Sequence, residues 1–164
     1  MTKTLLLMRH AKSSWKDEAL GDHDRPLNKR GQHDAPRMGQ LMCEESLLPE
    51  LVVSSTAERA RATSALVAEA AGYDGEVLLT ADLYHAGATD IVAVVHRLDD
   101  RYRSVLLVGH NPGMVDLLER LTGGGQHFPT AALAQLRLRV THWHDVGLNT
   151  AATLIGFWQP RDLT

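Results

Sequence analysis

The chain has 164 residues, with 17 Lys and Arg against 20 Asp and Glu, so its formal net charge is −3. An apolar fraction of 44% and a charged fraction of 23% are typical of one globular domain, here residues 1–164, and exclude a disordered tail. The single cysteine, Cys43, has no partner in the chain, which excludes a disulfide scaffold and fits a reducing compartment. We expect Cys43 to be a buried or half-buried helix thiol.

The N-terminal segment indicates where the protein works. Only four apolar residues, 5–8, precede Arg9 and His10, a run too short for a signal peptide, and no apolar run approaches the roughly 18 residues of a membrane span. The slight negative charge and 5% aromatic content lack the basic, stacking surface that nucleic acids require. We therefore expect a cytoplasmic protein with neither a membrane nor a nucleic-acid partner.

Short apolar runs alternate with longer stretches of helical spacing, which predicts a largely parallel sheet covered by helices. The predicted strands are residues 4–8, 51–54, 76–80, 104–108, 134–140 and 152–157, and the predicted helices are residues 28–43, 57–71, 89–98 and 112–121. Gly31 and Pro36 predict a late start or a kink in the first helix. Asn111 and Pro112 predict the N-cap and first position of the last helix.

Arginine or histidine follows three of the predicted strands. Arg9 and His10 come directly after the first strand, Arg59 lies in the first turn after the second, and His110 follows the fourth. Ligands bind at the carboxyl ends of strands in open α/β sheets, and helix N-termini there favour anions. By itself the Arg9-His10 pair could be an exposed strand end. The presence of Arg59 and His110 at equivalent strand ends makes that interpretation much less favourable, so the sequence predicts a phosphate-sized anion site at this edge.

Four segments carry these residues, LLLMRHAKSSW, DRPLNKRG, SSTAERARAT and VLLVGHNPG, and they occur in the order and spacing of a known family. Together with residues 128–130 and 157–160, they resemble the histidine phosphatase superfamily, in particular its small SixA-like branch. The resemblance covers nearly the whole chain. It implies an α/β fold, a three-layer α/β/α sandwich with a mostly parallel central sheet of the phosphoglycerate mutase type.

The resemblance also implies a chemistry. His10 would be the nucleophile that accepts a phosphoryl group and passes it to water, with its other ring nitrogen held by a backbone acceptor. Arg9 and Arg59 would clamp the phosphoryl oxygens, and His110 would donate to the transferring group. No metal or cofactor is implied. The favoured substrate is a phosphohistidine-bearing protein, the alternatives are a small-molecule phosphate or a noncatalytic phosphoprotein binder, and the chain would be a monomer or weak dimer.

Further substrate contacts and the proton donor are less well marked. Ser13 matches a small hydroxyl residue of the first motif, and Arg25 and His85 are further candidates for substrate binding. Many family members carry a glutamate after the third strand, which this chain lacks. His85, Asp22 or Asp24 could donate the proton, or none need do so if the leaving group is a good one, which favours phosphoramidates.

Several charged residues have a structural reading beside the functional one. Lys16 could contact either phosphate or water. For Arg30, an ion pair with an acidic neighbour is favoured over a contact with substrate. Arg61 lies on the other side of its helix from Arg59 and is expected to be solvated or structural, whereas Thr63, one turn on, could support Arg59. His142 and His144 look like a metal pair, but a surface strand end is favoured, because no further ligand is expected nearby.

Overall fold

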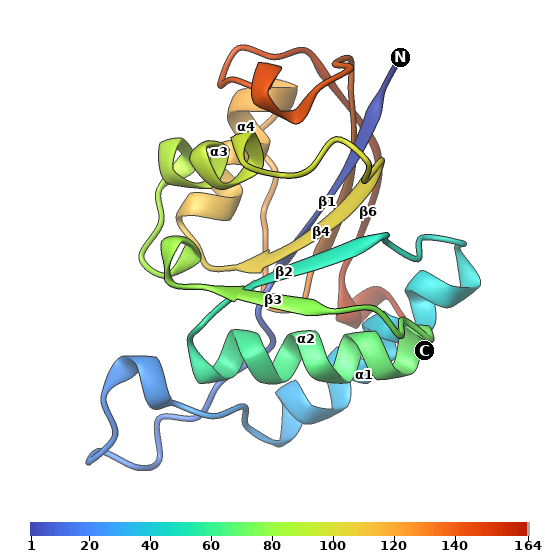
Figure 1. Cartoon of the computed structure of the whole chain (residues 1–164). Helices are drawn as coiled ribbons and strands as arrows, with labels where there is room; N and C mark the ends of the chain where they lie inside the picture. The colour runs from blue at the N-terminus through green and yellow to red at the C-terminus, as the bar shows by residue number, and fades with distance from the viewer. Residues whose placement is uncertain (164) are drawn as a thin grey trace.

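The computed structural model describes residues 1–163 as a six-stranded sheet with helices on both faces (Figure 1). The strands are β1 (Lys3–Arg9), β2 (Leu51–Ser55), β3 (Val77–Thr80), β4 (Ser104–Gly109), β5 (Leu133–Leu138) and β6 (Ala152–Trp158). Their order across the sheet is β3-β2-β4-β1-β5-β6. All six predicted strands are confirmed, with ends within two residues of those expected.

The strand directions bring the predicted functional residues to one edge. β1 pairs in parallel with β4, and β2 pairs in parallel with both β4 and β3. β5 and β6 run antiparallel on the far side of β1. Because β1, β2 and β4 point the same way, the chain segments that follow them leave the sheet side by side.

Four helices cover the sheet: α1 (Lys29–Glu44), α2 (Glu58–Ala71), α3 (Ala88–His96) and α4 (Gly113–Thr122). The prediction of a late start for α1 is wrong, because the helix begins directly after Asn28, whose side chain accepts from the Gly31 amide at 2.8 Å. Pro36 lies inside this helix. The predicted start of α4 is also wrong by one residue. Pro112 is its N-cap after a cis peptide bond, while the Asn111 side chain accepts from the Val115 amide at 3.3 Å.

The core lies in two layers, one on each face of the sheet, with α1 and α2 below and α3 and α4 above in Figure 1. β1 serves both layers. Leu5 and Leu7 pack into the layer of α3 and α4, and Leu6 and Met8 into that of α1 and α2. Side chains alternate between the faces of a strand, so a strand buried on both faces reads as a continuous apolar run. This explains why β1 has no polar residue between Thr4 and Arg9.

Helix α1 holds the segment that follows His10. The Asn28 amide donates to the Lys12 carbonyl oxygen at 3.0 Å. A Cβ at Gly31 would lie 2.2 Å from that same oxygen, far inside van der Waals contact. Only glycine permits this approach, so the PLNKRG part of the second motif sets the position of the backbone beside the candidate site.

Two further findings concern the helices. Cys43 is exposed, so the expectation of a buried or half-buried thiol is wrong, because its position on α1 faces away from the sheet. None of the helices within residues 1–163 has the length and apolar character needed to cross a membrane.

The expected strand end at His142 and His144 is also wrong. β5 ends at Leu138, and Trp143–Asp145 forms a short 3-10 turn with the Trp143 side chain fully buried. Asp100 lies beside the two exposed histidines, with one ligand-type atom of each of the three residues within 4.8 Å of the others. Asp100 is therefore a third side chain of a metal-ligating type beside the two histidines, whereas no further ligand was expected nearby. The Asp100 carboxylate is engaged by the His142 ring at 2.9 Å and by the Trp143 amide at 2.8 Å.

Candidate active site

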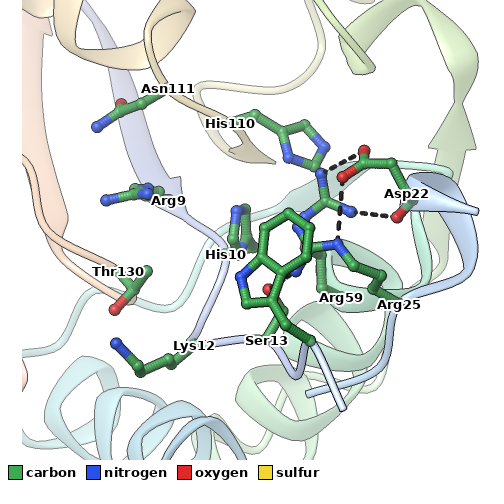
Figure 2. A pocket seen from close by; sticks show the side chains of 11 residues that line it. Arg9, His10, Lys12, Ser13, Asp22, Arg25, Arg59, His110, Asn111 and Thr130 are labelled. Atoms are coloured by element: carbon green, nitrogen blue, oxygen red, sulfur yellow. Dashed lines mark hydrogen bonds and ion pairs between the residues drawn. The ribbon is translucent and has the colours of Figure 1, made fainter. Parts of the chain in front are cut away.

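A cavity of about 390 Å³ opens at the carboxyl edge of the parallel strands (Figure 2). Its lining includes all four residues predicted to be catalytic and two of the three predicted substrate contacts. The lining residues are Arg9, His10, Lys12, Ser13, Trp15, Asp22, Arg25, Arg59, His110, Asn111 and Thr130. Residues from five separate parts of the chain thus meet around one space.

His10 lies directly after β1 and is 7% exposed. Its backbone amide donates to the Gly109 carbonyl oxygen at 3.0 Å, which ties the end of β1 to the end of β4. The His10 Nδ1 is 2.7 Å from the Ala11 carbonyl oxygen. A carbonyl can only accept, so Nδ1 carries the proton and Nε2 carries the lone pair.

Burial keeps this imidazole neutral. The pKa of His10 is lowered to about 3, mainly because burial disfavours the charged ring and further because His110, Arg59 and Arg9 add positive charge nearby, against the raising effect of the Ala11 carbonyl. A neutral ring with a free Nε2 is a nucleophile that is available throughout the physiological pH range.

The two predicted clamp arginines each present a nitrogen with no protein partner. Arg59, at the start of α2, is 6% exposed, and Arg9 ends β1. The Nε atoms of both guanidinium groups are buried and have no hydrogen-bond partner among the described residues. The Arg9 Nη1 makes one long bond, 3.4 Å, to the Phe128 carbonyl oxygen. Buried charged donors left unpaired are costly, so this arrangement indicates that an anion completes the site.

His110 supplies a third unpartnered nitrogen. It follows β4 and is 8% exposed, and its Nε2 is 2.8 Å from the Ser55 hydroxyl. Its Nδ1 is buried and has no partner within residues 1–163. Its pKa is lowered to about 4, first by burial and then by the charge of Arg59. The ring centroid is 5.0 Å from that of His10. With the Ser55 hydroxyl donating to Nε2, the Nδ1–H can donate to an anion beside His10.

One carboxylate, that of Asp22, also lines the cavity. It accepts from the Tyr84 hydroxyl at 2.6 Å, from Arg59 Nη2 at 3.0 Å and from Arg25 Nε at 3.2 Å. The Asp22 carbonyl oxygen accepts a further bond from Arg59 Nη1 at 2.7 Å. The Tyr84 hydrogen bond lowers the pKa of Asp22 most, and the Arg59 bond and charge lower it further, so this carboxyl is ionised at neutral pH.

Comparison with known proteins agrees with this geometry. A family model described as the histidine phosphatase superfamily (branch 1) matches residues 5–91. A protein of Mycobacterium tuberculosis, itself uncharacterised, is 34% identical over 165 residues, which cover 94% of this chain and 100% of the other. The chain belongs to the histidine phosphatase superfamily.

Solved structures share the whole fold of this histidine phosphatase. A SixA protein of Agrobacterium tumefaciens, named as a candidate phosphohistidine phosphatase, superposes with a TM-score of 0.83 at 30% identity, covering 96% of this chain and 98% of the other. The protein histidine phosphatase SixA in complex with tungstate superposes with a TM-score of 0.81 at 21% identity, covering 98% and 99%. The chain therefore has the phosphoglycerate mutase-like fold and is a phosphoric hydrolase that works through a histidine on phosphorylated substrates.

The remaining predicted residues of the phosphatase fall into different places. Ser13 and Arg25 line the cavity and contact each other, with Arg25 Nη1 donating to the Ser13 hydroxyl at 2.7 Å. His85 lines a neighbouring cavity, and its ring lies 3.9 Å from that of Tyr84. Asp24 is exposed and pairs with its neighbour His23. Neither His85 nor Asp24 lines the cavity that holds His10.

The structural readings of three other residues are confirmed. Arg30 pairs with Asp34 at 3.4 Å, and Arg61 pairs with Glu58 at 2.7 Å. The buried Thr63 hydroxyl donates to the Arg59 carbonyl oxygen at 2.6 Å and accepts from the Ala11 amide at 2.9 Å. Thr63 therefore supports both the helix turn of Arg59 and the segment after His10.

Sequence reasoning missed several residues of the site. Lys12, Asn111 and Thr130 line the cavity, and each lies inside or beside a motif that had been identified for other residues. For Lys12 and Asn111 a signal was available, because Lys12 lies two residues after His10 and Asn111 directly follows His110. Tyr84 lies 62 residues from Asp22, and no local pattern indicates that its hydroxyl reaches that carboxylate.

Proposed function

We propose that His10 is the nucleophile of this phosphatase and that its preferred substrate is a phosphohistidine side chain carried by another protein. The observation that carries the proposal is the neutral His10 ring with its lone pair on Nε2. It lines one cavity with Arg9, Arg59 and His110, each of which has a buried side-chain nitrogen without a partner among the described residues. Phosphoryl transfer depends on positioned donors around the equatorial oxygens more than on further covalent chemistry.

In the first step, the His10 Nε2 lone pair forms a bond to phosphorus while the bond to the leaving group breaks. The leaving group keeps the electron pair. Arg9, Arg59 and His110 donate to the phosphoryl oxygens, and the Ala11 carbonyl accepts from Nδ1–H as the phosphorylated ring gains positive character. In the second step, water attacks phosphorus, the bond to Nε2 breaks, and inorganic phosphate and neutral His10 are released.

The nature of the leaving group follows from the carboxyl that lines the cavity. An alkoxide needs a proton from a general acid as it leaves, but Asp22 is held as an ionised acceptor, and Asp24 and His85 lie outside this cavity. The imidazole of phosphohistidine takes up a proton from solvent readily and needs no such donor. The absence of a carboxylic acid from the described lining of the cavity therefore favours a phosphoramidate.

A protein is the favoured carrier of that group. Trp15 and Lys12, both exposed, border the cavity, so its mouth lies at the molecular surface where a side chain of another protein can enter. The SixA neighbour, named as a candidate phosphohistidine phosphatase, supports this choice. The single cysteine fits action in a reducing compartment such as the cytoplasm.

The test compares kcat/KM for a phosphohistidine carrier protein, phosphoimidazole and p-nitrophenyl phosphate, with His10→Ala as the control. We expect the two phosphoramidates to be preferred and an acid-labile phosphoenzyme to form only with His10 present. Preference for the ester would indicate a small-molecule phosphatase. Phosphate binding without turnover by the wild type would indicate a phosphoprotein binder.

A further inference from the structure

The lining of the cavity contains four positively charged side chains and a single carboxylate. Arg9, Lys12, Arg25 and Arg59 supply the positive charge, and Asp22 supplies the negative charge. In Figure 2 the Asp22 carboxylate lies beside the outer edges of Arg59 and Arg25, on the His110 side of the cavity. A carboxylate beside a phosphate site repels phosphate, so its presence calls for an explanation.

We propose that Asp22 is a specificity-determining residue, which favours a phosphoryl donor with a neutral or cationic leaving group and disfavours one with a second anionic group beside the phosphoryl group. This inference rests on the proposed function, because it explains how the same site distinguishes a phosphohistidine from acidic phosphate metabolites. Nothing in the family motifs requires it, since Asp22 lies outside the four segments that carry the resemblance.

Asp22 engages only part of the Arg59 guanidinium. Its two terminal nitrogens donate to Asp22, one to the carbonyl oxygen and one to the carboxylate, while Nε has no partner in the part of the chain that the structure describes. A phosphoryl group that binds Nε therefore shares one guanidinium with the carboxylate. The two anionic groups then lie only several ångströms apart. At that distance the Asp22 carboxylate interacts electrostatically with the leaving group attached to the phosphoryl group.

Protein side chains hold the Asp22 carboxylate in place. The Tyr84 hydroxyl and Arg25 Nε both donate to its carboxylate, and neither contact uses a nitrogen that is left open for the phosphoryl group. Arg25 is itself fixed by the Ser13 hydroxyl at 2.7 Å. The carboxylate is thus held in the cavity wall by protein side chains whose contacts leave the Arg59 Nε open.

The Trp15 ring lines the same cavity as Asp22 and lies against Arg25. The Arg25 guanidinium carbon lies 3.5 Å from the centre of the Trp15 ring, and Trp15 is nevertheless 74% exposed. An aromatic face and a carboxylate at one mouth suit a flat, protonated heterocycle, through stacking and charge attraction. Imidazolium has both properties, whereas a carboxylate or second phosphate has neither.

The experiment measures kcat/KM for phosphoimidazole and for phosphorylated imidazole-4-acetate, which differ by one carboxylate. We expect the wild type to prefer phosphoimidazole by about tenfold at low salt, the order expected for like charges several ångströms apart at a partly exposed site. The preference should shrink as ionic strength rises. Asp22→Asn should reduce the preference to about twofold or less, chiefly by improving use of the carboxylated substrate.

Asp24→Asn is the matched control. Asp24 belongs to the same short turn, but its side chain is 72% exposed and it contacts His23 instead of the arginines. It should retain the full preference. Asp22→Glu keeps the charge and should also retain the preference, even where the longer side chain lowers the rate for both substrates.

Two results would overturn the inference. An equal loss of activity on both substrates in Asp22→Asn would show that Asp22 only positions Arg59, and an unchanged preference would show that its charge has no influence. Calorimetric binding of phenylphosphonate and 4-carboxyphenylphosphonate tests the same discrimination without turnover. If the wild type fails to hydrolyse phosphoimidazole, the proposed function fails, while this binding ratio still decides the role of Asp22.

Discussion

The floor and the rim of the cavity differ in how their polar groups are satisfied. The floor, formed by Arg9, His10, Arg59 and His110, has three buried nitrogens without partners among the described residues. The rim, formed by Trp15, Asp22 and Arg25, is joined by its own hydrogen bonds and ring contact. A floor that is incomplete without an anion provides affinity and chemistry. The rim is held by its own contacts and by bonds from Tyr84 and Arg59 to Asp22, so we expect it to modify which anion enters, while catalysis depends on the floor.

Removal of the nucleophile tests the floor most severely. His10→Ala should lower kcat/KM by about 10³-fold or more and abolish the acid-labile phosphoenzyme, because no other described lining residue offers a neutral imidazole with a free Nε2. Phosphate binding should weaken only modestly, since the arginines remain. Rapid-quench trapping and calorimetry measure the two effects, and substantial residual turnover would show that another group attacks phosphorus.

Arg59→Ala tests the residue that belongs to both the floor and the rim contacts. We expect a loss of about 10²–10³ in kcat/KM with the fold retained, because one positioned donor to the transferring group is removed. Arg61→Ala is the control, since Arg61 lies two residues further along the same helix and pairs with Glu58 at the surface. Steady-state kinetics of the two variants should differ sharply, and similar losses would contradict the assigned clamp.

Thr63→Val tests the support beneath the floor. The substitution keeps the volume but leaves the buried Ala11 amide without its acceptor, which should lower the free energy of unfolding by about 1–3 kcal/mol. A severalfold fall in kcat/KM should accompany it, because the segment after His10 loosens. Ser64→Ala, which removes a buried hydroxyl bonded only to the Ala60 carbonyl oxygen, should have the smaller effect in urea unfolding and in kinetics.

The last expected effect is on stability alone and depends on pH. The pKa of His10 is lowered to about 3 in the folded chain, against about 6.5 for an ordinary histidine, so below pH 6.5 the unfolded state binds the proton that the folded state refuses. The free energy of unfolding should therefore fall as pH decreases from 7 towards 4.

Thermal unfolding of the wild type and His10→Ala across this range isolates that contribution, and the variant should lose part of the slope. The exposed His33, replaced by alanine, is the matched control and should keep the wild-type slope. Equal slopes in the wild type and His10→Ala would contradict the neutral, buried state of His10.

Much of the fold and of the floor could be predicted from the sequence because both depend on local patterns. The apolar run of β1 needs no knowledge of its neighbours to read as a strand buried on both faces, since β-sheet side chains alternate. Arg9 ends β1, His10 and His110 follow β1 and β4 directly, and the ends of parallel strands meet at one edge. The position of Arg59 in the first turn after β2 follows by the same reasoning.

Only the tertiary structure decided the rim and the surface contacts. The meeting of Tyr84 with Asp22 joins residues 62 apart, and that of Asp100 with His142 joins residues 42 apart, through loops whose paths no periodicity encodes. The exposure of Cys43 likewise depends on which face of α1 meets the sheet. Strand and helix patterns are set by hydrophobic periodicity within a few residues. Side-chain pairing between loops depends instead on the positions that the loops take once the core has packed.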